Sequence, residues 1–171
     1  MISPDVRNIA LDLDDTIVKT REIFRAKMNE VYGVLGMAMI GFSREAIKEE
    51  FERINNSAFW THYVNPNRWD AVMEQFCGQH PQVTSGVRRS CREILASIYG
   101  QVPEFKDGAR KALEGLKNRG YALGLVTHAE KKWTDFKLER LSLTETFGQG
   151  VCSEHERTEG QATVEKRIGK V

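Results

Sequence analysis

The stretch at residues 9–18, IALDLDDTIV, limits what this chain can fold into more than any other part of the sequence. An apolar run that is not interrupted by regular polar positions is typical of a strand buried on both faces of a parallel sheet. The run ends in Asp12, Asp14 and Asp15, and open α/β sheets carry their sites at the carboxyl ends of the strands. Because like charges in one place repel one another, this clustering predicts a cation or a shared proton among the acids.

The same acids also permit a purely structural interpretation. Asp14, Asp15 and Thr16 could cap the turn that follows the strand, since Asp and Thr favour such positions for their side-chain hydrogen bonds. Asp12 does not fit this alternative as well, because it interrupts the apolar run instead of following it. A buried carboxylate costs several kcal/mol unless it is paired or bound to a metal. Asp12 is therefore the stronger candidate for chemistry.

Length and charge set broad limits on the class of protein. A chain of 171 residues has room for one domain, or for one core and a smaller inserted module. Its 25 Lys and Arg residues balance 24 Asp and Glu residues, which is not typical of a protein that binds nucleic acid or a membrane surface. No basic leader and no run near the ~18 apolar residues of a membrane span are present, so we expect a soluble, cytoplasmic protein.

The cysteines agree with that expectation. Cys77, Cys91 and Cys152 are odd in number, far apart and without a C-x-x-C spacing. This pattern favours reduced thiols, and it supports neither a disulfide framework nor a zinc site.

Residues 21–100 have the apolar spacing of helices throughout. We predict a first helix over residues 21–32 that stops near Gly33, with the glycine-rich residues 33–41 as a connector. A second helix follows Ser43 as its N-cap, and a third begins at Pro66. A fourth helix carries the apolar stripe at residues 87–98 and ends at Gly100. We interpret this block as an inserted helical module in an α/β core formed by residues 1–20 and 101–171.

The α/β pattern resumes after the block. A helix that ends near Gly120 precedes the apolar strand at residues 121–126, and this strand ends in Thr127 and His128. A helix over roughly residues 130–141 and a short strand over residues 147–152 follow, with a last helix from about residue 161. Strands and crossover helices of this kind predict a Rossmann-like parallel sheet, so both strand ends face one cleft. About three strands can be counted, whereas doubly wound sheets usually have five or six.

The two strand ends hold the groups that phosphoryl transfer needs, namely a nucleophile, a cation and donors to the phosphoryl oxygens. Asp12 can act as the carboxylate nucleophile. Asp14 returns to the same side of an extended chain and can act as general acid and then base. Mg²⁺ suits such an oxygen-rich site, and the Thr127 hydroxyl can donate to the phosphoryl group.

These motifs resemble those of the haloacid dehalogenase-like (HAD) superfamily, and the resemblance covers nearly the whole chain. The first motif is Asp12-Leu13-Asp14-Asp15-Thr16 at the end of an apolar run, and the second is the strand that ends in Thr127. The helical block is similar in place to the family's cap. The resemblance implies that Asp12 is the nucleophile and a metal ligand, and that Asp14 is the acid/base and gives a backbone carbonyl to Mg²⁺. It also implies that Thr127 holds phosphate.

The later part of the chain departs from the family pattern. The third motif is a Lys or Arg, but residues 153–160 contain no lysine, and Arg157 is the nearest cation. Lys166 and Lys170 lie on or after the predicted last helix. The fourth motif, an acidic Gly-Asp strand end, is absent, so the chain resembles a C-terminally truncated member whose sheet is incomplete on its C-terminal side.

We therefore expect a Mg²⁺-dependent phosphatase that acts on a small phosphorylated compound through an aspartyl-phosphate on Asp12. The alternative interpretation is a truncated or degenerate protein of this kind without full activity, which serves as a binding or interaction module. His128 is a further candidate for the substrate pocket, with a hydrogen-bonded structural role as its alternative. An unpaired sheet edge also favours self-association.

Overall fold

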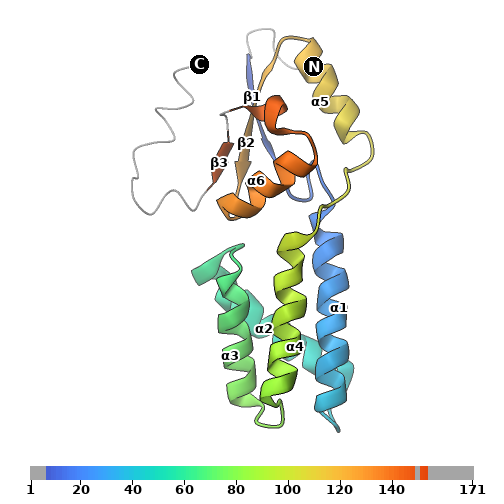
Figure 1. Cartoon of the computed structure of the whole chain (residues 1–171), viewed down its shortest axis with the longest axis vertical. Coiled ribbons are helices and arrows are strands. Elements are labelled where there is room, and N and C mark those ends of the chain that lie inside the picture. The colour runs from blue at the N-terminus through green and yellow to red at the C-terminus, as the bar shows by residue number, and fades with distance from the viewer. Residues whose placement is uncertain (1–6, 149–150, 154–171) are drawn as a thin grey trace. The chain divides into compact units, whose positions relative to one another are not determined.

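A computed structural model describes residues 7–148 and 151–153 of the chain (Figure 1). It confirms the predicted fold class, an α/β structure with a parallel sheet and a block of helices inserted after the first strand. The chain divides into two compact units, Met1–Thr20 together with Val102–Val171, and Arg21–Gln101. The first is the α/β core, and the second is the helical cap.

The sheet of the core consists of β1 (Asn8–Asp12), β2 (Ala122–Thr127) and β3 (Val151–Ser153), in that order and all parallel. Asp12 pairs in register with Val126, so the carboxyl ends of β1 and β2 lie side by side. This register brings the ends of the two predicted site strands together at the carboxyl side of the sheet. The sequence pattern predicts this strand over residues 8–13, and β1 ends one residue earlier, at Asp12.

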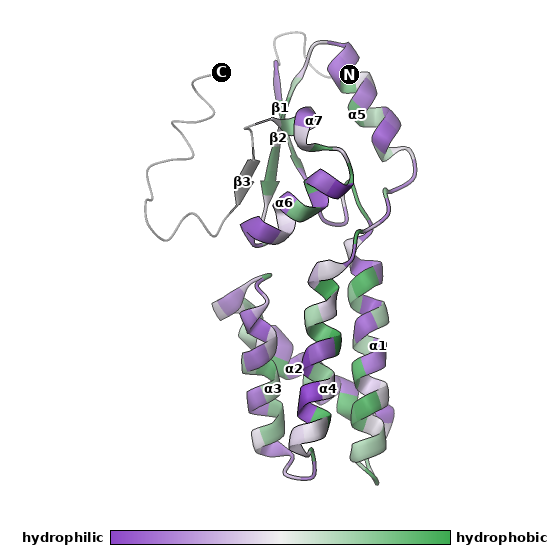
Figure 2. Ribbon diagram, viewed as in Figure 1, coloured by the Kyte–Doolittle hydropathy of each residue, from purple (hydrophilic) through white to green (hydrophobic). Residues whose placement is uncertain are grey.

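Three helices cover one face of this sheet, namely α5 (Ala109–Asn118), α6 (Lys131–Arg140) and α7 (Thr144–Phe147) (Figure 1). Their apolar residues pack with β2, whose hydrophobic character is visible in Figure 2. The buried members of this core are Leu13, Ile17, Val18, Leu113, Leu123, Leu125, Leu138, Leu141, Leu143 and Phe147.

The prediction of a strand from residue 147 was wrong in its first part. Phe147 belongs to α7, where its side chain is buried in the core with Leu143, four residues earlier. Gly148 ends the helix with a φ of 53°, a conformation that favours glycine. The strand itself starts only at Val151.

The cap contains four long helices and a short 3₁₀ helix. They are α1 (Thr20–Ala38), α2 (Arg44–His62), α3 (Asn67–Gln79), α4 (Ser85–Ala96) and η1 (Ser97–Gly100). The predicted N-cap is confirmed, because the Ser43 hydroxyl accepts the Ala46 N–H at 3.1 Å. No helix within the described ranges is long and apolar enough to cross a membrane.

The prediction that the first cap helix stops near Gly33 was also wrong. α1 continues to Ala38, and Val31, Leu35 and Met39 are buried at a spacing of four residues. Packing of this stripe outweighs the low helix propensity of glycine, which costs only about 1 kcal/mol in a helix interior. The predicted connector therefore extends the helix by more than a turn.

Cys77 and Cys91 of the cap are both free thiols. Burial raises the pKa of the Cys91 thiol to about 12, and it raises the pKa of Cys77 as well. Since the thiolate is the reactive form, neither side chain is activated as a nucleophile.

Candidate active site

The loop after β1 is held rigidly by its own main chain. The amides of Ile17 and Val18 donate to the Leu13 carbonyl at 2.9 and 3.1 Å, and the Asp15 amide donates to the Val18 carbonyl at 2.8 Å. Leu13, Ile17 and Val18 anchor the loop in the core, and Asp15 adopts a left-handed conformation with a φ of 61°. Asp15 thus shapes the turn, as the structural interpretation of the sequence suggested.

Asp12 is the last residue of β1, and its side chain is exposed, so the sequence-based expectation of a buried carboxylate at this position was wrong. One carboxylate oxygen accepts the hydroxyl of Thr16 at 2.9 Å, which fixes the orientation of the group. An accessible carboxylate that is oriented by a hydroxyl donor can reach a substrate, as a nucleophile must.

Asp14, in contrast, is held firmly. Its carboxylate oxygen Oδ1 accepts the hydroxyl of Thr20 at 2.5 Å. The ammonium of Lys137 donates to both oxygens, at 2.5 Å to Oδ1 and 2.8 Å to Oδ2. Only 22% of the Asp14 side chain is exposed. The two predicted catalytic carboxylates therefore have different environments, one open and one anchored.

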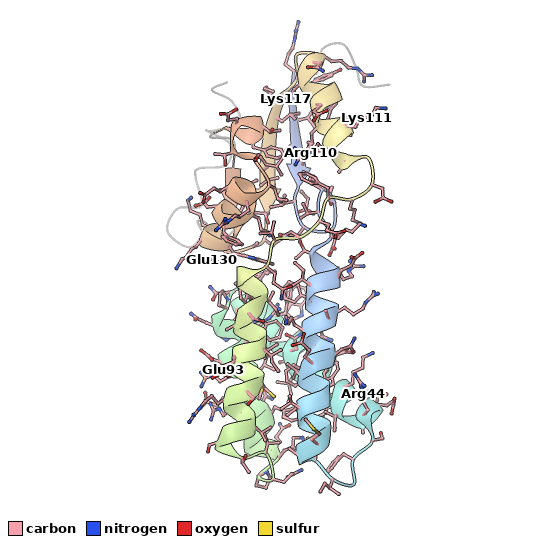
Figure 3. The ribbon with its side chains drawn as sticks, turned by 45° about the vertical axis from the view of Figure 1, so that its right-hand side comes forward. Arg44, Glu93, Arg110, Lys111, Lys117 and Glu130 are labelled. Atoms are coloured by element: carbon pink, nitrogen blue, oxygen red, sulfur yellow. The ribbon has the colours of Figure 1, made fainter. Side chains whose placement is uncertain are left out.

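Lys137 comes from the middle of α6, and its side chain has no exposed surface. Its ammonium lies 3.7 Å from the centroid of the Trp133 ring, one turn earlier, which adds a cation–π contact. The start of α6 is fixed by Glu130, whose carboxylate accepts the Trp133 amide at 3.0 Å (Figure 3). These contacts direct the ammonium toward Asp14.

Burial and the nearby carboxylates shift the pKa of Lys137 in opposite directions. Burial of the ammonium lowers the pKa of Lys137 below its ordinary value, and the carboxylates of Asp14, Asp12 and Asp15 oppose that shift without cancelling it. An ammonium group of the protein itself thus lies beside Asp14, one of the carboxylates of the cluster.

The sequence pattern predicted no functional role for Lys137, and the nearest candidate cation lay within residues 153–160 instead. A signal does exist in the sequence, because Lys137 falls on the buried stripe of its helix with Trp133, Thr134 and Leu138. A lysine at an apolar position implies an acidic partner, since buried charges are paired. That partner, however, is 123 residues away in the sequence and could not be identified without the fold.

Thr127 ends β2, next to the strand that carries Asp12, and it is 1% exposed. Its hydroxyl oxygen accepts the Ala129 amide at 3.1 Å, so the hydroxyl proton remains a donor. His128 follows and is exposed. Arg157 and the predicted last helix lie outside the described residues.

The described side chains supply few ligands for a metal. Among them, no group of three or more His, Cys, Asp or Glu side chains is placed to hold an ion. Asp12 offers an exposed carboxylate, while the Asp14 carboxylate is bound to Lys137, which leaves the main-chain carbonyl of Asp14 as its donor. Mg²⁺ is commonly held by one or two carboxylates, waters and substrate phosphate oxygens. This small set of oxygen donors fits Mg²⁺ that binds together with substrate.

A shallow depression of about 670 Å³ lies along α5. Arg110 and Lys111, two of the α5 residues that line it, are labelled in Figure 3. The Arg110 guanidinium stacks on the Phe105 ring at 4.4 Å and forms part of its wall. No carboxylate of the acid cluster lines this depression, so it is separate from the candidate active site.

The core belongs to the class of α/β proteins that place an acidic site at the carboxyl ends of parallel strands. Residues 9–166 match the family model of the haloacid dehalogenase-like hydrolases, and the chain belongs to this family. No match was found among curated protein sequences.

Solved structures share the fold at low sequence identity. A haloacid dehalogenase-like family hydrolase from Xanthomonas campestris superposes with a TM-score of 0.73 at 15% identity, covering 86% of this chain and 61% of that one. A predicted phosphoglycolate phosphatase from Haemophilus somnus gives a TM-score of 0.56 at 18% identity, with 90% and 65% covered. An L-2-haloacid dehalogenase from Xanthobacter autotrophicus, with chloropropionic acid covalently bound, gives 0.56 at 11% identity, with 97% and 66% covered. The chain thus spans less than two thirds of the length of these structures.

Proposed function

We propose that this hydrolase cleaves the phosphate monoester of a small compound, with Asp12 as the nucleophile, Asp14 as the acid/base and Mg²⁺ as the cofactor. The observation that carries the proposal is the contrast between the two carboxylates. Asp12 is exposed and oriented by the Thr16 hydroxyl, whereas Asp14 is anchored by Lys137 and Thr20. A nucleophile must reach the substrate, and a proton-transfer group must hold its position.

The reaction proceeds in two displacements. A carboxylate oxygen of Asp12 attacks the phosphorus and the bond from phosphorus to the ester oxygen breaks. Asp14, which must carry a proton in the substrate complex, gives that proton to the departing alcohol oxygen. A water molecule then attacks the aspartyl-phosphate, Asp14 takes a proton from that water, and inorganic phosphate leaves with Asp12 restored. Each step needs only a nucleophile, a proton carrier and donors for the phosphoryl oxygens.

Other groups of the site bind the substrate. The Thr127 hydroxyl donates its free proton to a phosphoryl oxygen, and His128 and Arg157 are further candidates for substrate contacts. When bound by the Asp12 carboxylate and the Asp14 main-chain carbonyl, Mg²⁺ offsets the repulsion between the nucleophile and the phosphate.

Asp14 favours phosphate ester hydrolysis over dehalogenation. An alcohol leaving group requires a proton, and a carboxyl group two residues from the nucleophile can supply it. A halide ion departs without a proton, so an anchored acid at this position has no purpose in that reaction. A predicted phosphatase and a dehalogenase both stand among the structural neighbours, so the fold alone does not separate the two reactions.

Self-association is a further proposal about partners. Among the described strands, β1 pairs only with β2, so within the described residues its other edge has no partner strand. Such an edge can pair with another chain.

The function is tested by two assays on the same purified protein with Mg²⁺. We expect release of inorganic phosphate from an aryl phosphate and no release of chloride from 2-chloropropionate. Chloride release without phosphate release would replace the phosphatase by a dehalogenase. Inactivity in both assays would favour the alternative of a binding or interaction module.

A further inference from the structure

We infer that Lys137 is the resident cation of the carboxylate cluster and that it positions Asp14 for proton transfer. The second part of this inference rests on the proposed function, while the first concerns the cluster alone. Lys137 lies on α6, which is the helix that follows β2. Its ammonium donates hydrogen bonds to Asp14 and not to the proposed nucleophile Asp12.

The burial of Lys137 separates it from an ordinary ion pair. Lys131 on the same helix pairs with Asp135 at 2.6 Å, but both of those side chains are more than half exposed, and such surface pairs contribute little. The side chain of Lys137 has no exposed surface. Ordering and desolvating an ammonium there costs free energy that an apolar residue of the same length would avoid. Residues that break the packing rule in this way are expected at functional sites.

The geometry gives the ammonium a positioning role. It holds both oxygens of Asp14 at once, and the Thr20 hydroxyl holds one of them from a second element. The Trp133 ring limits the movement of the ammonium on another side. A carboxylate bound at both oxygens cannot turn freely, so Asp14 stays in one orientation. Misplacement of a reacting group by about 1 Å can reduce a rate by about 100-fold.

The kinetic experiment compares Lys137→Met, Lys137→Arg and the exposed Lys132→Met on the same helix as a matched control. With an aryl phosphate and saturating Mg²⁺, we expect kcat of Lys137→Met to fall by about 10- to 100-fold while KM stays within about 3-fold. Lys137→Arg keeps the charge and should recover part of kcat. Lys132→Met should match the wild type.

A second readout does not depend on activity. Lys137→Met removes a positive charge that partly neutralises the carboxylates and repels a second cation. Mg²⁺ should therefore bind Lys137→Met about 3- to 10-fold more tightly than it binds the wild type, as measured by isothermal titration calorimetry. Lys137→Arg and Lys132→Met should bind Mg²⁺ as the wild type does. If Lys137→Met does not fold at the assay temperature, Lys137→Gln gives the same comparison, because it retains a donor without the charge.

The outcomes separate this inference from the proposed function. A wild type without phosphatase activity would refute the function, and tighter Mg²⁺ binding by Lys137→Met would still support Lys137 as the resident cation. Equal Mg²⁺ affinity and equal kcat in Lys137→Met and Lys132→Met would overturn the inference. A loss of kcat in Lys137→Met with no recovery in Lys137→Arg and unchanged Mg²⁺ affinity would overturn it as well.

Discussion

Replacement of Asp12 by Asn is expected to reduce phosphate release from an aryl phosphate by at least about 1000-fold, because an amide cannot form the covalent intermediate. The change removes one charge and keeps the shape of the side chain. Asp12 is exposed, so its loss should leave the fold intact. Steady-state kinetics with Mg²⁺, together with circular dichroism to verify folding, measure the effect.

Asp15→Asn is the matched control for this variant. It makes the same chemical change three residues away, and Asn tolerates the left-handed conformation that Asp15 adopts. We expect it to retain activity within about 10-fold. Equal activity of Asp12→Asn and Asp15→Asn would show that Asp12 is not the nucleophile.

The second large effect concerns the stability of the cap. Phe51 of α2 has no exposed surface, and its ring contacts Tyr32 and Phe76 at centroid distances of 5.9 and 5.4 Å. Phe51→Ala leaves a cavity between three helices, and such changes cost about 3–5 kcal/mol of the free energy of unfolding. Urea unfolding followed by circular dichroism measures this loss.

Trp60→Ala tests whether burial, and not aromatic character, causes the loss. Trp60 lies on the same helix, but 75% of its surface is exposed. We expect its truncation to change the free energy of unfolding by less than about 1 kcal/mol. Similar losses for Phe51→Ala and Trp60→Ala would contradict the description of the cap core.

Much of the fold follows from periodicity in the sequence. The strands β1 and β2 were predicted from continuous apolar runs, and the helices of the cap were predicted from apolar residues at helical spacing. The helix end at Gly33 was misplaced because a local glycine signal competes with a buried stripe whose importance appears only after packing. The same limit applies to Phe147, whose burial depends on helices far away in the sequence.

The candidate site likewise has residues that the sequence pattern predicts and a residue that only the fold reveals. Asp12, Asp14 and Thr127 were predicted as site residues because each lies at or just after the end of a predicted strand, and the ends of β1 and β2 do lie side by side. Lys137 was not found, because its meaning depends on the contact between α6 and the loop after β1. Sequence predicts which strand ends meet, but it does not show which side chain of a helix turns toward them.

The central proposal is an aspartyl-phosphate on Asp12, and rapid acid quench followed by peptide mass spectrometry tests it most directly. Wild-type protein mixed with Mg²⁺ and an aryl phosphate should yield a phosphorylated peptide that contains residues 9–18, with the phosphoryl group on Asp12. The Asp12→Asn variant should yield none. Steady phosphate release by the wild type without any phosphorylated peptide, or phosphorylation that persists in Asp12→Asn, would contradict the proposed mechanism.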